Sequence, residues 1–110
     1  MIEDKLSRIE DKIRKAPSMQ EENKESVLNL IDELKEELQA VSAEDSERLS
    51  STGSFAEAGT NEVVRKDGDK GILDIALNGV RESVKEFEET HPRLVQVINS
   101  ICTQLSNSGL

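Results

Sequence analysis

Large aliphatic residues recur at alternating spacings of four and three in the two outer parts of the chain, a pattern that predicts four amphipathic helices. Two predicted helices lie within residues 1–41 and meet at Pro17, and the other two lie within residues 72–110 and meet at Pro92. Proline ends or begins a helix, and both connections are short, so each pair is predicted to form an antiparallel hairpin. The predicted apolar stripes are, in chain order, Ile2, Leu6, Ile9 and Ile13; Val27, Ile31, Leu34, Leu38 and Val41; Leu73, Leu77, Val80, Val84 and Phe87; and Leu94, Ile98, Ile101 and Leu105.

The pattern lapses in the middle of the chain, over residues 42–71. Twelve of these 30 residues are Ser, Thr, Gly or Asn, and only Leu49, Phe55, Val63 and Val64 are large and apolar. Because little apolar surface is available to offset the entropy of ordering the segment, a flexible polar linker is predicted. The alternative is a small β-hairpin, in which residues 63–66 and 72–73 pair around Asp67-Gly68.

These patterns together predict an all-α fold of two antiparallel helical hairpins joined by a long flexible linker. The boundaries are 1–41 for the N-terminal hairpin, 42–71 for the linker and 72–110 for the C-terminal hairpin, with all three parts in one folding unit. The four helices are expected to form a bundle or a coiled-coil-like assembly. The sequence leaves open whether the hairpins pack within one chain or between two.

The composition indicates a thin core. The chain of 110 residues has no Trp or Tyr, and Phe55 and Phe87 are its only aromatic residues. The core must therefore be built from aliphatic side chains, each of which buries less area than an aromatic one. Narrow apolar seams of this kind are typical of helices that meet partners, so we expect a homodimer in which hairpins from two chains complete a bundle.

The charge is strongly negative and unevenly distributed. There are 14 Lys and Arg residues against 23 Asp and Glu, a net charge of −9, and ten of the acids lie between residues 18 and 47. Such a field repels phosphate backbones and anionic headgroups, so neither nucleic acid nor a membrane is an expected partner. The acidic second helix, with Glu33, Glu36 and Glu37, is either a solvated face or a surface that docks a basic protein.

Residues that carry chemistry are few. Cys102 is the only cysteine, so no intrachain disulfide can form. The N-terminal residues are charged and no apolar run is long enough to span a membrane, which indicates a cytoplasmic protein. His91 and Cys102 lack further ligands at zinc spacing, and residues 67–78 depart from a calcium loop at its glycine and its glutamate. We therefore expect no catalytic residue, no cofactor and no metal.

The turn before the last helix resembles a known family. The run from Phe87 to Leu94, Phe-Glu-Glu-Thr-His-Pro-Arg-Leu, precedes an aliphatic helix that ends at Ser106-Asn-Ser-Gly-Leu110. Together with Ala16-Pro17 in the first turn, it resembles the bacterial family called domain of unknown function four-four-zero-four. The resemblance implies a short, helical, bacterial protein, and it implies no activity. The candidate interaction surface therefore includes the corner formed by Phe87, His91 and Arg93, in addition to the acidic helix.

The function these features favour is a non-catalytic, self-associating protein–protein interaction module. The acidic second helix or the corner at residues 87–94 would contact another, unidentified protein. The alternative is a nucleic-acid-associated regulator, since two helices joined at His91-Pro92 resemble a helix-turn-helix. Arg93 is the only base in the last predicted helix, which argues against this alternative.

Overall fold

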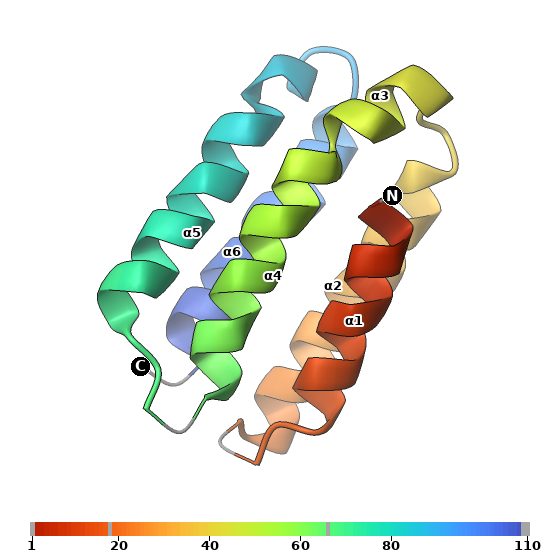
Figure 1. Cartoon of the computed structure of the whole chain (residues 1–110). Coiled ribbons are helices and arrows are strands. Elements are labelled where there is room, and N and C mark those ends of the chain that lie inside the picture. Colours follow the sequence, from red (N-terminus) through yellow and green to blue (C-terminus); the bar gives the residue numbers. More distant parts are fainter. Residues whose placement is uncertain (1, 18, 66, 109–110) are drawn as a thin grey trace.

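The computed structural model describes residues 2–17, 19–65 and 67–108, and these residues form helices and short connections without any strand (Figure 1). The five long helices, of 13 to 18 residues, are α1 (Ile2–Arg14), α2 (Glu21–Leu38), α4 (Ser50–Val64), α5 (Lys70–Val84) and α6 (Pro92–Asn107). Two short elements are α3 (Ala43–Arg48) and the 3-10 helix η1 (Lys85–Phe87). The predicted all-α class is confirmed, but the prediction of four helices is wrong.

The long helices surround a common apolar interior. Around this interior α1 packs beside α2 and α4, α2 packs beside α6, and α5 packs between α4 and α6 (Figure 1). The pairs α1–α2, α4–α5 and α5–α6 are antiparallel, whereas α1 and α4 run in the same direction. Helix α3 crosses one end of the molecule and connects α2 to α4.

Four of the five long helices follow the predicted stripes. Ile2, Leu6, Ile9 and Ile13 of α1 are all buried, as are the stripes of α5 and α6. Helix α2 ends at Leu38, three residues before the predicted end, because the N–H groups of residues 39–41 donate to carbonyls three positions earlier and close tight turns. Pro92 is the first residue of α6, where its missing N–H is not needed.

The predicted flexible linker over residues 42–71 is wrong as a description of this segment. It contains α3 and the whole of α4, which packs against α5 more extensively than any other two helices pack together. Ser42 caps α3, because its Oγ accepts a hydrogen bond from the N–H of Asp45 at 3.2 Å. Leu49, between α3 and α4, is fully buried.

Helix α4 packs through small residues, which explains why the spacing of large aliphatic residues did not predict it. Its buried side chains include Thr52 and Thr60, together with Gly53 and Gly59. A Cβ at Gly53 would lie 2.9 Å from Cδ of Lys5, and one at Gly59 would lie 3.3 Å from Cδ2 of Leu77. The glycines thus let α4 approach α1 on one side and α5 on the other.

The alternative β-hairpin is also wrong. Val63 and Val64 are the last residues of α4, and Ile72 and Leu73 lie in the first turn of α5. Asp69 caps α5, since its Oδ1 accepts from the N–H of Ile72 at 3.1 Å. The connection between the helices is therefore a capped turn.

Candidate interaction surface

The structure brings together three of the six residues predicted to form an interaction surface. Arg93, at the start of α6, has guanidinium nitrogens 3.7 Å from Glu33 Oε1 and 3.9 Å from Glu37 Oε1, both on α2. Glu36 is exposed on α2. Arg93 is therefore paired with two acids of its own chain, and these three residues form an internal contact.

The other two predicted residues are placed differently. Phe87 is only 2% exposed, so the prediction that it contributes to a surface is wrong. Its ring packs in the core, 6.2 Å from the His91 ring between centroids, because η1 turns it inward beneath the connection to α6. His91 is half-buried, with Nε2 3.6 Å from Oδ2 of Asp45 on α3. These two residues therefore hold the turn against the packed helices.

Three of the four basic residues of α1, namely Lys5, Arg8 and Lys12, face α4. The Lys5 ammonium donates to Ser50 O at 2.9 Å and to the hydroxyls of Ser50 and Ser54, both at 2.8 Å. One turn further on, Arg8 Nε and Lys12 Nζ each donate to Glu57 Oε2 at 2.9 Å. The bases on this side of α1 are thus partnered within the chain.

The carboxyl group of Glu57, which accepts from Arg8 and Lys12, has a shifted pKa. The hydrogen bond from Arg8, together with the ammonium of Lys12, lowers the pKa of Glu57 to about 2. The carboxylate is therefore ionised at neutral pH and binds α4 to α1. This arrangement is structural, because a general acid or base at neutral pH needs a pKa closer to 7.

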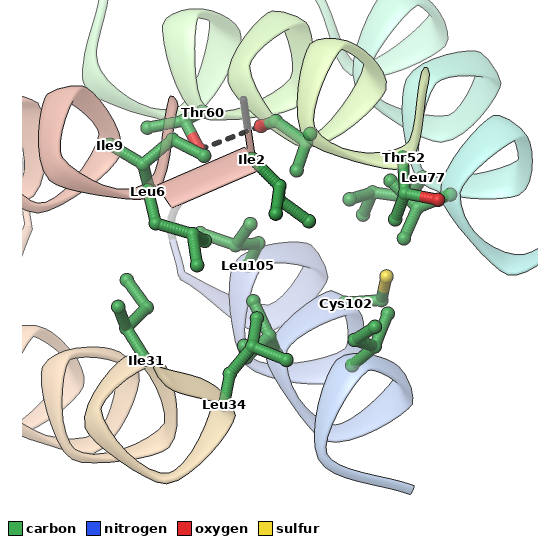
Figure 2. A pocket seen from close by; sticks show the side chains of 15 residues that line it. Ile2, Leu6, Ile9, Ile31, Leu34, Thr52, Thr60, Leu77, Cys102 and Leu105 are labelled. Carbon is green, nitrogen blue, oxygen red and sulfur yellow. Dashed lines mark hydrogen bonds between the residues drawn. The ribbon is translucent and has the colours of Figure 1, made fainter. Parts of the chain in front are cut away.

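The interior contains a small apolar cavity between the helices. Figure 2 shows side chains from α1, α2, α4, α5 and α6 around it, among them Ile31, Thr60 and Leu105. The Thr60 hydroxyl donates to the carbonyl of Ala56 in its own helix at 2.8 Å (Figure 2). The cavity volume is about 30 Å³. Pockets for small molecules have volumes of at least about 300 Å³, so this cavity is a packing void.

Cys102 also lines this interior. Burial raises the pKa of its thiol to about 11, so the sulfur is protonated at neutral pH. A protonated, buried thiol behaves as a small apolar side chain and is a poor nucleophile. The residues that the structure describes contain no group of three or more His, Cys, Asp or Glu side chains placed to hold a metal ion.

A different surface, on α4 and α5, exposes large apolar side chains. Within the described ranges, the large hydrophobic residues left exposed are Ile75 (72%), Ile72 (48%) and Phe55 (42%). Ile72, Ile75 and Gly79 are spaced three and four apart, on one face of α5. Phe55 and the exposed Ala58 lie three apart on α4. We call these five residues the α4–α5 face.

Phe55 joins the two helices of this face. A Cβ placed on Gly79 would lie 2.7 to 3.0 Å from ring atoms of Phe55, so the ring lies directly over the glycine. This contact explains why residue 79, in the middle of α5, is a glycine. The ring remains partly open to solvent on its outer side, and the face is continuous from α4 to α5.

Helix α6 has an exposed face of a third kind. A shallow depression runs along it, lined by the uncharged polar residues Gln96, Asn99, Ser100, Thr103 and Gln104. All of these belong to one helix, so no neighbouring element encloses the depression. The α6 face and the α4–α5 face both lack charges at their centres, but the first is polar and the second is apolar.

None of the helices in the described part of the chain combines the length and the apolar character needed to cross a membrane.

Comparison with known proteins identifies the family. The model of the family described as Domain of unknown function (DUF4404) matches residues 2–110. No curated protein and no solved structure matches the chain. The family match spans nearly the whole sequence, including α4, which the resemblance at the two proline turns did not cover. The chain therefore belongs to the DUF4404 family, a domain of unknown function.

Proposed function

We propose that the protein is a non-catalytic interaction module that docks another protein chain through the α4–α5 face. The observation that carries this proposal is the exposure of Phe55, Ile72 and Ile75 on one surface, while the apolar stripes of α1, α2, α5 and α6 are buried. Apolar and aromatic residues without charges are typical of the centre of a protein–protein interface. The acidic helix α2 then has the role of a solvated face.

The charges near this surface favour a protein partner. Helix α4 has two charged residues, Glu57 and Glu62, and both are nearly buried and paired within the chain. Asp74 and Glu82 of α5 lie at the border of the face. A surface with an apolar centre and a charged rim has the usual anatomy of a docking site for a folded protein.

The chemistry of the interior supports a non-catalytic role. The cavity is about 30 Å³ and is lined by aliphatic side chains, two threonines and a protonated thiol. Such a site offers no activated nucleophile and no group with a pKa near 7.

The nucleic-acid alternative gains no support from the arrangement of α6. Its one base, Arg93, lies beside Glu33 and Glu37 of α2. A recognition helix needs free bases to contact phosphates and base edges.

Site-specific photo-crosslinking in cells tests the docking role. A photoreactive residue replaces Ile75 in one variant and Asn99 of α6 in a control variant. We expect a cross-linked protein of defined mass from position 75, and its loss when Ile72→Ser is added beside the crosslinker. Equal cross-linking from both positions, or none from position 75, would contradict the proposal.

A further inference from the structure

We propose that Asn78 is a site of spontaneous deamidation and that Phe55 controls the rate of this modification. Asn78 is exposed in the middle of α5 and is followed in the chain by Gly79. The Phe55 ring, which comes from α4, lies directly over this glycine. The inference concerns the chemistry of these three residues and does not depend on the docking role proposed above.

The reaction consumes only water. The backbone nitrogen of Gly79 attacks Cγ of the Asn78 side chain, so that an N–Cγ bond forms while the Cγ–Nδ2 bond breaks. The departing amino group takes the amide proton of Gly79 and leaves as ammonia, and the product is a cyclic succinimide. Water then opens the ring at either carbonyl, which leaves aspartate or isoaspartate at position 78. Glycine at the following position favours the attack, because it has no side chain to hinder the approach of its nitrogen.

The helical conformation of α5 opposes this reaction. Closing the ring requires a ψ angle at Asn78 far from the helical value, because the atoms of the succinimide lie nearly in one plane. In an α-helix the backbone N–H groups are also held in hydrogen bonds to carbonyls one turn earlier. Asn78 and Gly79 must therefore leave the helical conformation before the nitrogen can attack. The free-energy cost of such a local opening depends on the contacts that the segment makes.

The contact with Phe55 opposes this opening. Glycine is a weaker helix former than any residue but proline, and asparagine is also among the weaker ones, so the helix itself stabilises this pair little. Asn78 is exposed, and Gly79 has no side chain to bury. A Cβ placed on Gly79 would lie 2.7 to 3.0 Å from atoms of the Phe55 ring. Unwinding α5 at this point disrupts that close packing, so the ring stabilises the unreactive conformation.

Deamidation weakens the helix in which it occurs. When the succinimide opens to isoaspartate, the chain continues through the former side chain, and the backbone gains a methylene group. The added group puts the residues before and after position 78 out of register for helical hydrogen bonds. Because α5 packs against both α4 and α6, the loss of helix should weaken both contacts. The modification is thus an irreversible, age-dependent change in the stability of the chain.

Peptide mass spectrometry of the purified full chain, incubated at mildly alkaline pH, measures deamidation at each asparagine. Ser100→Gly creates an internal control, because it places a glycine after Asn99 on the exposed face of α6, which is lined by residues of that helix alone. In this background, Phe55→Ala should accelerate deamidation at Asn78 about tenfold and leave the rate at Asn99 unchanged. Phe55→Leu keeps part of the contact and should accelerate the reaction less. Circular dichroism verifies that each variant is folded.

Two further variants separate local opening from other causes. Ile31→Ala removes volume from the core on α2, so it should lower the unfolding temperature more than Phe55→Ala but accelerate deamidation at Asn78 less. Asn78→Gln, added to Phe55→Ala, lengthens the side chain so that the ring closes poorly, and should prevent the loss of helical signal that Phe55→Ala alone shows during incubation. Equal acceleration at Asn78 and Asn99, no acceleration in Phe55→Ala, or a larger effect of Ile31→Ala overturns the inference. A helical signal that stays constant while Asn78 converts overturns the stated effect on α5.

Discussion

Helices α2 and α4 are similar in length but pack with opposite kinds of side chain. Helix α2 buries Val27, Ile31, Leu34 and Leu38. Helix α4 buries two glycines, two threonines and Glu62, and Val63 is its one large buried aliphatic residue. The first helix gains stability from the area of each side chain, and the second from close approach to its neighbours. We therefore expect α2 to be sensitive to a loss of side-chain volume and α4 to be sensitive to a gain.

The largest expected effect is a loss of volume on α2. Ile31 is 1% exposed and lines the central cavity, so Ile31→Ala enlarges an existing void and should lower the free energy of unfolding by about 3 kcal/mol. The corresponding change on α4, Thr60→Ala, removes one methyl group and a hydroxyl bonded only within its own helix, and should cost about 1 kcal/mol. Urea denaturation of both variants measures the difference. Equal losses would show that the two helices do not pack differently.

A gain of volume should destabilise α4 at a position where it approaches a neighbouring helix closely. Gly59→Val adds methyl groups where even a Cβ would lie 3.3 Å from Leu77 and 3.5 Å from Ala76, and we expect a loss of about 2 kcal/mol. The control is Ala58→Val, the preceding and exposed residue of the same helix, which should cost about 0.5 kcal/mol from helix propensity alone. Thermal unfolding compares the two. If Gly59→Val is as stable as Ala58→Val, then close approach is not what holds α4.

The smallest of these effects concerns the ion pairs between α1 and α4. The folded pKa of Glu57, about 2, is below its ordinary value of 4.5, so its ionisation stabilises the fold above pH 4.5 and this contribution is lost as the pH falls toward 2. Glu57→Gln should lower the free energy of unfolding by about 1 kcal/mol at neutral pH, a modest value because Arg8 is half exposed to solvent.

Urea titrations of the wild type and Glu57→Gln between pH 7 and pH 2 measure that contribution. The gap between the two proteins should close below pH 4.5, since only the wild type loses the ion pair. Glu36→Gln, at an exposed position of α2, is the control and should show no such gap. A gap that persists at pH 2 would mean that Glu57 acts through packing.

The contrast between α2 and α4 also explains how much of the fold could be predicted from the sequence. Helices α1, α2, α5 and α6 were predicted because their buried positions are large aliphatic residues at spacings of four and three. The sequence predicts a linker where α4 lies, because the buried residues of this helix, such as Gly53 and Thr60, are of types that also dominate flexible segments. These residues are recognised as buried only when the side chains of α1 and α5 that pack against them are known. Those contacts belong to the tertiary structure and leave no local pattern in the sequence.

The candidate surface was predicted in part. The sequence pointed to Glu33, Glu37 and Arg93, and the fold brings these three together as an internal contact. The α4–α5 face was missed, although one signal was present. Ile72 and Ile75 are apolar but lie outside the stripe of Leu73 and Leu77, so α5 has more apolar positions than one buried face needs. Phe55 gives no signal, because the segment around it has the composition of a flexible linker.

Thr60 shows how a hydrogen bond within a helix can make a polar side chain pack like an apolar one. Once its hydroxyl proton is directed at the carbonyl of Ala56, the part of the side chain that remains for other helices is a methyl group. To its surroundings such a threonine is close to a valine, although its residue type is classed as polar. Bundles in other proteins that contain serine- and threonine-rich stretches deserve the same inspection, since some of those stretches will be interior helices whose polar atoms are already satisfied.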